Sequence, residues 1–561
     1  MSGGLIQLAA FGTQDILLTA NPQITFFKVT IRRHTAFAIE SIMQTITGSG
    51  TTFGSDLTVT IARSGDLLWR TNIEVVIPQL IDNYSTPGGI SGTWTPARWT
   101  DDIGHHLIQS CEVQIGGQRI DKHYSDWLQI WSQLTVPAEK RDGYNRMIGN
   151  VMELCGCPDH PTFNSSSSTQ LTYNRSAYRI FVPLQFWFCR SPGMALPLIA
   201  LPYHEVKLMI RLNDARNLII PGSVNLVDPI DVLSSDTSSV TSVANSGSTA
   251  YTISNPADTI SSTPLEMQVW ADYIYLDVNE RKRFAQTSHE YLIDQLQYTG
   301  GQNISASVNE AQLTLNFNHP TKELVWVLRK DSYTKQTVDH VNNPHNVINQ
   351  WSNYQICAYD AMRNNYSNVD GRVNGNMTFG NMSTTDFNPV SIARLQINGN
   401  DRFRDRVGEY FNLVQTYQHH TCIPQSKGIN VYSFGLTPED IQPTGTINFS
   451  RIDNTQLIIR VKDTIPAVPV GLVGFNNESN TVAYTAGSTV NANSKYIVRE
   501  GGNAIPIGFG PYATNNANVS VNPARYIADT TDVTGYNVLV YATNFNVLRI
   551  ISGMGGLAFS N

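Results

Sequence analysis

The chain has little charge for its size. Among 561 residues, Lys and Arg total 38 and Asp and Glu total 45, so charged residues make up 15% of the chain. Soluble domains typically carry about 25%. The net charge of -7 gives no electrostatic reason to bind nucleic acid along a broad face. We therefore expect no direct nucleic-acid binding, and a surface built from uncharged polar residues.

The chain also lacks a cysteine framework and long apolar runs. Its six cysteines are scattered without the spacing of a disulfide scaffold, which predicts free thiols in a reducing compartment. No stretch reaches the roughly 20 apolar residues that a membrane helix needs. Near the N-terminus, Gln7, Gln14 and Asp15 interrupt the apolar residues, and the positive region of a secretory signal is missing. These features predict a soluble protein made inside the cell.

Catalytic and metal-binding motifs are missing as well. The sequence has no G-x-S-x-G elbow, P-loop or H-E-x-x-H motif. Cys155–His160 (CGCPDH) places three soft ligands close together but lacks a second pair at zinc-finger spacing, so we expect a surface loop with reduced thiols. The doublets His105-His106 and His419-His420 would point apart in strands. We predict no catalytic residue, no cofactor and no metal.

What the chain does contain is one series of segments that occurs twice in the same order. The first half has VQIGGQRIDK (113–122), FVPLQFWF (181–188) and VKLMIRL (206–212). The second half has LQINGNDRFR (395–404), INVYSFGL (429–436) and QLIIRV (456–461). The spacing is far longer than the ~20 to 50 residues of solenoid or propeller repeats, so each unit is a whole domain.

Strand patterns dominate both halves. Leu57–Ile61 alternates apolar and polar residues, as a strand with one buried face does, whereas the apolar run Phe181–Phe188 predicts a strand covered on both sides. Ser125–Leu134 is the clearest helix, with Ser125 as its cap and Trp127, Ile130, Trp131 and Leu134 at helical spacing. We expect Trp131 to be buried where this helix rests on the first β-domain.

The domain boundaries follow from the same patterns. The polar segment 279–288 is helix-compatible and separates the two halves. Two segments, 221–264 and 468–524, lose hydrophobic periodicity and are predicted surface loops, either functional or tolerated decoration. We expect an all-β fold of tandem sandwiches in a jelly-roll arrangement. The expected division is an N-terminal arm (1–23), a first sandwich (24–278), a linker helix (279–288) and a second sandwich (289–561).

Long segments spread over nearly the whole chain resemble the major capsid proteins of the nucleocytoplasmic large DNA viruses. The opening segment GGLIQLAAFGTQDILLTANPQITFFKVTIRRHTAFAIES is similar nearly throughout. The other similar segments are 115–135, 183–208, 273–297, 317–328, 398–421 and 428–454. The least similar parts are the loops, residues 85–98 and the region after Val461. A resemblance of this length is specific, because no single segment is a generic short motif.

The resemblance implies a double jelly roll with two eight-stranded sandwiches and short helices in the loops. It also implies a non-enzymatic structural subunit whose homotrimers form capsomers of pseudo-hexagonal outline and tile the icosahedral capsid of a virion. The implied partners are neighbouring capsomers, minor capsid and penton proteins, an inner membrane that the chain approaches without spanning, and glycans on the outer loops. Assembly in the host cytoplasm is implied too.

By the same analogy, the arm would run along the inner side of the shell and contact neighbours or minor capsid proteins. The assembly residues proposed on this basis are Gln14, Asp15, Asn21, Pro22, Arg32 and Arg33. Arg32 and Arg33 could bind phosphate, but arginines of this kind more often pair with carboxylates, here Asp15 or Glu40.

Three alternatives remain open from the sequence. A carbohydrate-binding β-sandwich would need exposed aromatic side chains on a loop, for which Trp94 and Trp99 are the nearest candidates. A minor capsid paralogue would carry the same segments as a major capsid protein. An enzyme on a β-sandwich would need a concave site with perturbed carboxylates, and the sequence nominates none.

Overall fold

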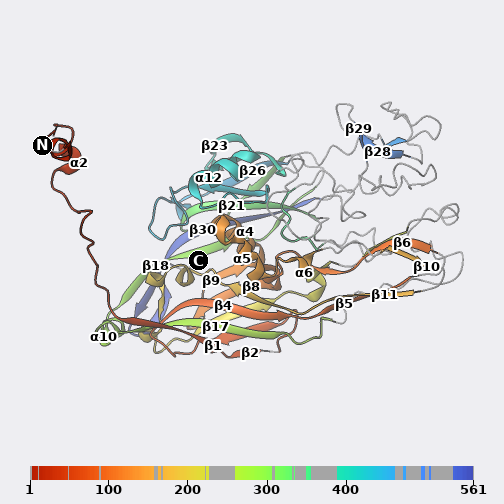
Figure 1. Cartoon of the computed structure of the whole chain (residues 1–561), viewed down its shortest axis with the longest axis horizontal. Coiled ribbons are helices and arrows are strands. Elements are labelled where there is room, and N and C mark those ends of the chain that lie inside the picture. Colours follow the sequence, from red (N-terminus) through yellow and green to blue (C-terminus); the bar gives the residue numbers. More distant parts are fainter. Residues whose placement is uncertain are drawn as a thin grey trace.

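Two β-sandwiches and a helical layer form a stack in the computed structural model (Figure 1). The structure describes residues 3–10, 12–48, 50–86, 90–156, 162–165, 169–220, 223–226, 260–305, 310–331, 334, 349–355, 388–461, 472–474, 494–498, 504–506 and 535–559. From the bottom of Figure 1 upward lie the two sheets of the first sandwich, the helices α4 and α5, and the two sheets of the second sandwich.

The first sandwich consists of two antiparallel sheets. Sheet 1 has the order β1-β17-β4-β12, formed by β1 (Phe37–Gln44), β17 (Glu266–Leu276), β4 (Leu67–Ile77) and β12 (Tyr178–Pro183), with β13 (Leu196–Pro197) beside β4. Sheet 2 has the order β2-β3-β14-β8-β9, formed by β2 (Ile46–Gly48), β3 (Asp56–Thr60), β14 (Val206–Leu212), β8 (Ile108–Ile115) and β9 (Gln118–Tyr124). Alternate residues of β4, β8 and β14 point into the core between the sheets.

The second sandwich repeats this order. Sheet 3 has the path β18-β30-β21-β24, formed by β18 (His289–Tyr298), β30 (Tyr536–Ile551), β21 (Pro320–Lys330) and β24 (Ile429–Ser433). It is extended by β19 (Gln302–Ile304), β25 (Ile447–Asn448) and β31 (Met554–Leu557). Sheet 4 has the order β20-β26-β22-β23, formed by β20 (Glu310–Thr314), β26 (Thr455–Val461), β22 (Val390–Ile397) and β23 (Asn400–Val407).

Shorter elements connect and decorate the sandwiches. Small sheets are formed by β5 (Leu80–Thr86) with β11 (Thr169–Arg175), β6 (Ile90–Thr95) with β10 (Thr162–Ser165) and β16 (Ser223–Leu226), β7 (Arg98–Trp99) with β15 (Ile219–Ile220), and β28 (Ser494–Val498) with β27 (Leu472–Gly474) and β29 (Ala504–Pro506). The helices of the first half are α3 (Ile103–Leu107), α4 (Ser125–Thr135), α5 (Ala138–Ile148), α6 (Met152–Cys155), α7 (Trp187–Arg190), η1 (Pro192–Met194), η2 (Leu198–Ala200) and α8 (Ala215–Leu218).

Further helices are α10 (Val278–Gln286), the π-helical turn η7 (Tyr410–Val414), α12 (Gln415–His419) and η8 (Phe449–Arg451). The arm contains α1 (Gly3–Ala9) and α2 (Ile16–Thr19). No helix in the described ranges is long and apolar enough to cross a membrane. The helix α10 lies between β17 and β18, at the position where the sequence predicted a linker helix.

The repeated sequence segments occupy equivalent places in the two sandwiches. The first segment of each series is a two-strand hairpin, β8-β9 in one sandwich and β22-β23 in the other. Both hairpins turn through two residues with positive φ, Gly116 (58°) with Gly117 (83°), and Asn398 (47°) with Gly399 (79°). This geometry is the two-residue turn that suits the twist of paired strands, and it favours Gly and Asn. The fold is therefore the double jelly roll that the sequence predicted.

Each sandwich has its own apolar core. The first core includes Val59, Ile73, Val113, Phe186 and Leu208, which lie between sheets 1 and 2. The second core includes Leu324, Trp326, Leu395, Phe411 and Val540, which lie between sheets 3 and 4. A third cluster does not belong to either sandwich alone, because it joins α4 to the outer face of sheet 3.

The helix α4 was predicted correctly as an element, but its expected packing partner was wrong. Trp131 is 4% exposed, yet its cluster contains Val325, Val431 and Leu539 of the second sandwich. The α4 helix follows β9 of the first sandwich, but its apolar face packs on the second sandwich. Ser125 is the first helical residue rather than a cap, since the helix begins after Tyr124 with no side-chain cap hydrogen bond.

Two other expectations need correction or lie outside the described residues. The run 181–188 is not one strand covered on both sides, because β12 ends at Pro183 and α7 begins at Trp187. Phe181 on the outer face of β12 is 39% exposed. Most of the predicted loops, 221–264 and 468–524, lies outside the residues that the structure describes.

Replacing Trp131 by Ala tests this placement. The side chain is buried between two domains, so its removal leaves a cavity, and we expect the free energy of unfolding to fall by ~3 to 5 kcal/mol. Urea denaturation followed by far-UV circular dichroism measures the change. Tyr203→Ala is the control, because Tyr203 is largely exposed and its loss should cost no more than ~0.5 kcal/mol. A loss for Trp131→Ala as small as that of the control would contradict the packing on sheet 3.

Candidate functional site

The interface between the two sandwiches is centred on α4. Its residues Trp127, Ile130, Trp131 and Leu134 are buried against the outer face of sheet 3. They have the i, i+3, i+4, i+7 spacing that places side chains on one helix face. The Trp127 ring lies 5.5 Å from the Tyr541 ring of β30, centroid to centroid. The largest side chains of the first sandwich's helix thus hold the second sandwich in place.

An ion pair fixes the start of α4 on sheet 3. The Arg329 guanidinium on β21 lies 2.8 Å from Asp126 Oδ1, and both side chains are largely buried. The Tyr354 hydroxyl donates a hydrogen bond of 2.8 Å to the same carboxylate oxygen. A buried charge is costly unless it is paired and hydrogen-bonded, so these partners depend on one another. Their arrangement joins residues more than 200 positions apart in the chain.

A second charged cluster lies on the other side of the helix. Asp294 Oδ2 on β18 is 2.8 Å from both Arg190 Nη1 of α7 and Lys322 Nζ of β21. Burial lowers the pKa of Lys322, and the Asp294 carboxylate acts in the opposite direction. The Arg190 guanidinium also lies 4.2 Å from the centroid of the Trp131 ring, where its charge faces the π electrons. This cluster therefore connects the first sandwich, α4 and the second sandwich.

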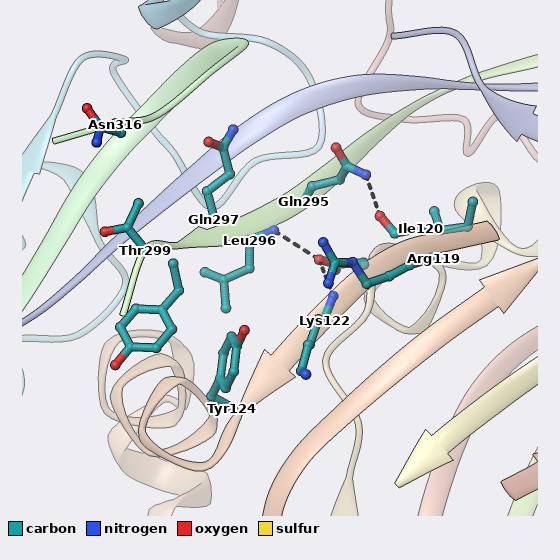
Figure 2. A pocket seen from close by; sticks show the side chains of 11 residues that line it. Arg119, Ile120, Lys122, Tyr124, Gln295, Leu296, Gln297, Thr299 and Asn316 are labelled. Carbon is teal, nitrogen blue, oxygen red and sulfur yellow. Dashed lines mark hydrogen bonds between the residues drawn. The ribbon is translucent and has the colours of Figure 1, made fainter. Parts of the chain in front are cut away.

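The two sandwiches also meet at strand edges, where β9 runs beside β18 (Figure 2). Gln295 Nε2 donates to the Ile120 carbonyl, and the Leu296 amide donates to Asp121 Oδ1 at 3.0 Å. A pocket of about 240 Å³ opens along this edge. It is lined by Arg119, Ile120, Asp121, Lys122, Tyr124, Gln295, Leu296, Gln297, Tyr298, Thr299 and Asn316. Two of its polar side chains, Gln295 and Asp121, bond across the interface, so this part of the pocket serves the contact between the domains.

The doublet His105-His106 lies in the buried helix α3 rather than in a strand. His105 Nδ1 lies 2.6 Å from Gln129 Oε1 and Nε2 lies 2.8 Å from the Tyr144 hydroxyl. Burial lowers the pKa of His105 to about 4 and that of His106 to about 3, so both rings are neutral near pH 7. They join α3, α4 and α5 as packing residues.

The second doublet is divided between two environments. His419 Nδ1 lies 2.7 Å from the Leu436 carbonyl near the surface. The buried His420 lies between two carboxylates, with Nε2 2.9 Å from Glu323 Oε2 and Nδ1 2.8 Å from Glu439 Oε1. Burial works against the charged ring, but Glu323 and Glu439 raise the pKa of His420 to about 9. The charge of His420 in turn lowers the pKa of Glu323 below its ordinary value.

The predicted assembly residues lie on the exposed N-terminal arm, which extends away from the body of the chain (Figure 1) and continues past the predicted boundary at residue 23 to the start of β1 at Phe37. None of the residues of α1 or α2 is buried, and the side chains of Leu17, Phe26 and Phe27 are at least 87% exposed. Asp15 caps its own local turn by accepting a hydrogen bond from the Gly12 amide. The other predicted residues, Gln14, Asn21, Pro22, Arg32 and Arg33, are exposed along the same arm.

Asn21 has a positive φ of 52°, at the point where α2 ends and the extended part of the arm begins. Within the described part of the chain, neither Arg32 nor Arg33 lies within ion-pair distance of Asp15 or Glu40. An arm with this much exposed apolar surface is typical of a segment that binds another molecule.

The other sequence candidates carry no chemistry in the described residues. Cys155 is buried, contrary to the expected surface loop, and burial raises the pKa of its thiol well above the ordinary value. Cys157 and His160 lie outside the described residues. No cluster of His, Cys, Asp or Glu in the described ranges could hold a metal ion. Trp99 is fully buried and offers no surface to a sugar, and the side chain of Trp94 is not among those described.

Sequence reasoning missed the charged residues of the interface. No sequence pattern marks these charges as buried, because a single charge in a strand or helix is ordinarily solvated. The residues concerned are Asp126, Asp294 and Arg329. The usable signal was Arg329, which directly follows the apolar run Leu324–Leu328 in β21. A charge adjoining such a run needs a partner if the strand is buried on both faces.

Family profiles match both halves of the chain. A profile described as "Major capsid protein N-terminus" matches residues 25–277. A second, described as "Large eukaryotic DNA virus major capsid protein", matches residues 280–502. The profiles adjoin at α10, which separates the two sandwiches.

Individual relatives match over the full length. The major capsid protein of Phaeocystis pouchetii virus is 38% identical, with all of both chains covered. The major capsid protein of Paramecium bursaria Chlorella virus 1 is also 38% identical, again with all of both chains covered. Among solved structures, a chain of the quasi-atomic model of the PBCV-1 virus capsid is 34% identical, with a TM-score of 0.56, and the alignment covers 96% of this chain and all of that one.

Replacing His420 by Gln tests the buried carboxylate cluster. Removing one partner of a buried ion pair costs ~3 to 5 kcal/mol while both groups are charged. Because the pKa of His420 is raised from 6.5 to about 9, its contribution is fully present below pH 6.5 and is lost as the pH rises through about 9. The lowered pKa of Glu323 means that its contribution is present above its ordinary value of 4.5 and is lost in acid.

The difference in free energy of unfolding between the wild type and His420→Gln should therefore be largest between pH 4.5 and 6.5 and shrink towards pH 9. Urea denaturation at a series of pH values measures it. His419→Gln is the matched control, because the neighbouring ring contacts only a backbone carbonyl near the surface. A difference that stays constant from pH 6.5 to 9 would show that His420 is not charged in the folded protein.

Proposed function

Because this chain belongs to the large eukaryotic DNA virus major capsid protein family, we propose that three copies of it form a capsomer of pseudo-hexagonal outline, and that these capsomers tile the icosahedral shell of the virion. The observation that carries the proposal is the internal repeat. Two sandwiches with the same strand order lie side by side in one chain, so three chains around a threefold axis present six similar units. Six such units give a hexagonal outline, which packs without gaps on a flat face.

The contact between the two sandwiches supports this arrangement. It is heterologous, because a helix of the first sandwich binds a sheet of the second, and among the described residues no helix of the second sandwich packs in the same way on sheet 1. Heterologous contacts form closed rings when each rotates the next unit by a constant angle that divides a full turn. A ring of six sandwiches contains three chains, which is the proposed homotrimer.

The remaining partners follow from the surfaces that the chain leaves exposed. The apolar N-terminal arm offers a contact to neighbouring capsomers and to minor capsid or penton proteins. In this proposal the arm lies near the inner side of the shell, close to an inner membrane, and the loops lie on the outer side, where glycans would be attached. Assembly takes place in the cytoplasm of the host. The chain acts as a structural subunit rather than an enzyme, and the buried ion pairs Asp126–Arg329 and Asp294–Arg190 support this because they join the two sandwiches.

The mass of the purified chain in solution tests the trimer. We expect light scattering to give about 187 kDa, three times the 62.2 kDa of one chain, and negative-stain images of the same fraction to show hexagonal particles. A stable, folded monomer at micromolar concentration would contradict a self-assembling capsomer. It would favour a subunit that trimerises only with an assembly partner.

Deleting residues 1–23 tests the role of the arm. No residue of α1 or α2 is buried, so the deletion should leave the trimer and its thermal unfolding temperature unchanged. We expect it to prevent incorporation of the trimer into shells in infected or co-expressing cells, measured as the amount of the chain in sedimented particles. The full-length chain expressed at the same level is the control. Normal incorporation of the shortened chain would exclude residues 1–23 from the contacts between capsomers.

A further inference from the structure

The contact inside the chain provides a template for a contact between chains. After the hairpin β8-β9, the α4 helix presents Trp127, Ile130, Trp131 and Leu134 to the outer face of sheet 3. On sheet 3 the receiving residues come from adjacent strands, namely Tyr298 of β18, Tyr541 and Leu539 of β30, Val325 and Val327 of β21, and Val431 and Ile429 of β24. The chain therefore shows what this kind of helix and this kind of sheet face do when they meet.

The second sandwich contains the equivalent helix. After the hairpin β22-β23 comes the segment η7-α12, whose residues Tyr410, Leu413, Val414 and Tyr417 have the same i, i+3, i+4, i+7 spacing as the four contact residues of α4. Here three of the four side chains are not covered: Leu413 is 47% exposed, Val414 is 40% exposed and Tyr417 is 75% exposed. Tyr410 is half-buried against the core of its own sandwich. The four equivalent residues of α4 are at most 4% exposed.

The two helical segments are anchored to their own sandwiches in the same way. Between the contact residues of α4 lies Gln129, which is buried and donates to Asp102 of the first sandwich at 2.8 Å. At the equivalent place in η7 lies Asn412, which is buried and donates to the carbonyl of Ile429 of the second sandwich at 2.7 Å. The side chains that bind each helix to its own domain match. The difference is on the opposite side of each helix: the outward apolar face of α4 is buried on sheet 3, whereas the outward apolar face of η7-α12 is exposed.

The first sandwich contains the equivalent sheet face. On the outer face of sheet 1, Met43 of β1 lies opposite Trp270 of β17, which lies opposite Asn72 of β4. Residues directly opposite each other in paired antiparallel strands share a face. Met43 is 54% exposed and Phe181 of β12 is 39% exposed on this face, which also carries the ion pair of Arg179 with Glu74. Sheet 3 has the same strand order and buries the apolar side chains of its outer face under α4.

The strand edges also include one contact that is made within the chain and an equivalent pair of strands that remains exposed. In the chain, the edge strand β9 of sheet 2 lies against the edge strand β18 of sheet 3. The equivalent strands are β23 at the edge of sheet 4 and β1 at the edge of sheet 1. Every residue of β23 except Phe403 is exposed, and so are the first five residues of β1. Uncovered strand edges are uncommon in stable proteins, because they pair with other chains.

We propose that the apolar face of η7-α12 (Tyr410, Leu413, Val414 and Tyr417) docks on the outer face of sheet 1 of a second copy of this chain, with β23 beside that copy's β1. The proposal rests on the trimer proposed above and names the residues that hold it. In Figure 1 the docking helix lies at the top of the stack and sheet 1 at the bottom, so one chain cannot make this contact with itself. The partner has to be another copy, bound head to tail.

Placing a carboxylate on the docking helix tests the contact. In the full-length chain, Leu413→Asp and Tyr417→Asp each put a charge into the proposed apolar interface. Both side chains are exposed in the single chain, so neither change should unfold it. We expect the mass measured by light scattering to fall threefold, to the 62.2 kDa of one chain, with an unchanged circular dichroism spectrum.

Two further variants complete this experiment. Gln286→Asp introduces the same carboxylate at an exposed position of α10, a helix that takes no part in the proposed contact, and should leave the trimer intact. Met43→Asp changes the receiving sheet and should dissociate the trimer as Leu413→Asp does. Trimers formed by all of these variants would overturn the docking contact and leave the trimer itself standing. A wild-type chain that is monomeric would overturn both.

A photocrosslink decides the matter if the charged variants fail to fold. Tyr417→benzoylphenylalanine keeps an aromatic ring at the exposed position and forms a covalent bond to a neighbouring C–H group on irradiation. In the wild-type background we expect covalent dimers and trimers, with the crosslinked peptide containing β1, β17, β4 or β12 of another copy. Mass spectrometry identifies the peptide. Crosslinks confined to any other surface of the partner would overturn the proposal.

Discussion

The packing of α4 on sheet 3 is the contact on which the rest of the structure depends. Trp127 and Trp131 leave the sandwich that their own hairpin belongs to and are buried on the next one. Burying two such side chains contributes several kcal/mol, since each apolar side chain of this size gains roughly 2 to 3 kcal/mol on transfer from water. Two sandwiches that could each fold around their own core therefore become a single unit with a fixed geometry.

Charge makes that geometry specific. A helix that packs only through apolar side chains can slide or rotate on a flat sheet at little cost. Asp126 prevents this, because its buried carboxylate on α4 has to meet Arg329 of β21 at 2.8 Å. Asp294 of β18 holds α7 of the first sandwich in the same way, through Arg190 at 2.8 Å. A displacement of the helix by one turn would leave Arg329 buried without its partner, which is far more costly than the loss of some apolar contact. Apolar burial provides the stability of the interface, and the ion pairs determine its register.

The two sandwiches could be predicted from the sequence, but the way in which they pack on each other could not. The alternating strands, the hairpin glycines and the repeated segments depend on local backbone chemistry, so they could be predicted, as could α4 from the spacing of its apolar residues. The partner of α4 could not, because an apolar helix face does not specify which sheet covers it, and Trp131 was assigned to the wrong sandwich. The predicted assembly residues were chosen from the arm by analogy. The exposed face around Leu413 and Tyr417 was missed, although the spacing that reveals it is present in the sequence.

A chain with two equivalent domains and one kind of heterologous contact can satisfy that contact only once internally. One helix face and one sheet face then remain without a partner. They lie at opposite ends of the stack of sheets, and both expose apolar side chains to water. Each added copy covers one of these faces but exposes an equivalent face at the new end, as in an open filament, unless the ring closes. Closure is the only arrangement in which every helix face and every sheet face is covered. The exposed residues on η7-α12 and on sheet 1 thus follow from the same repeat that makes the interior stable, and in the proposed docking they direct the chain towards a closed ring.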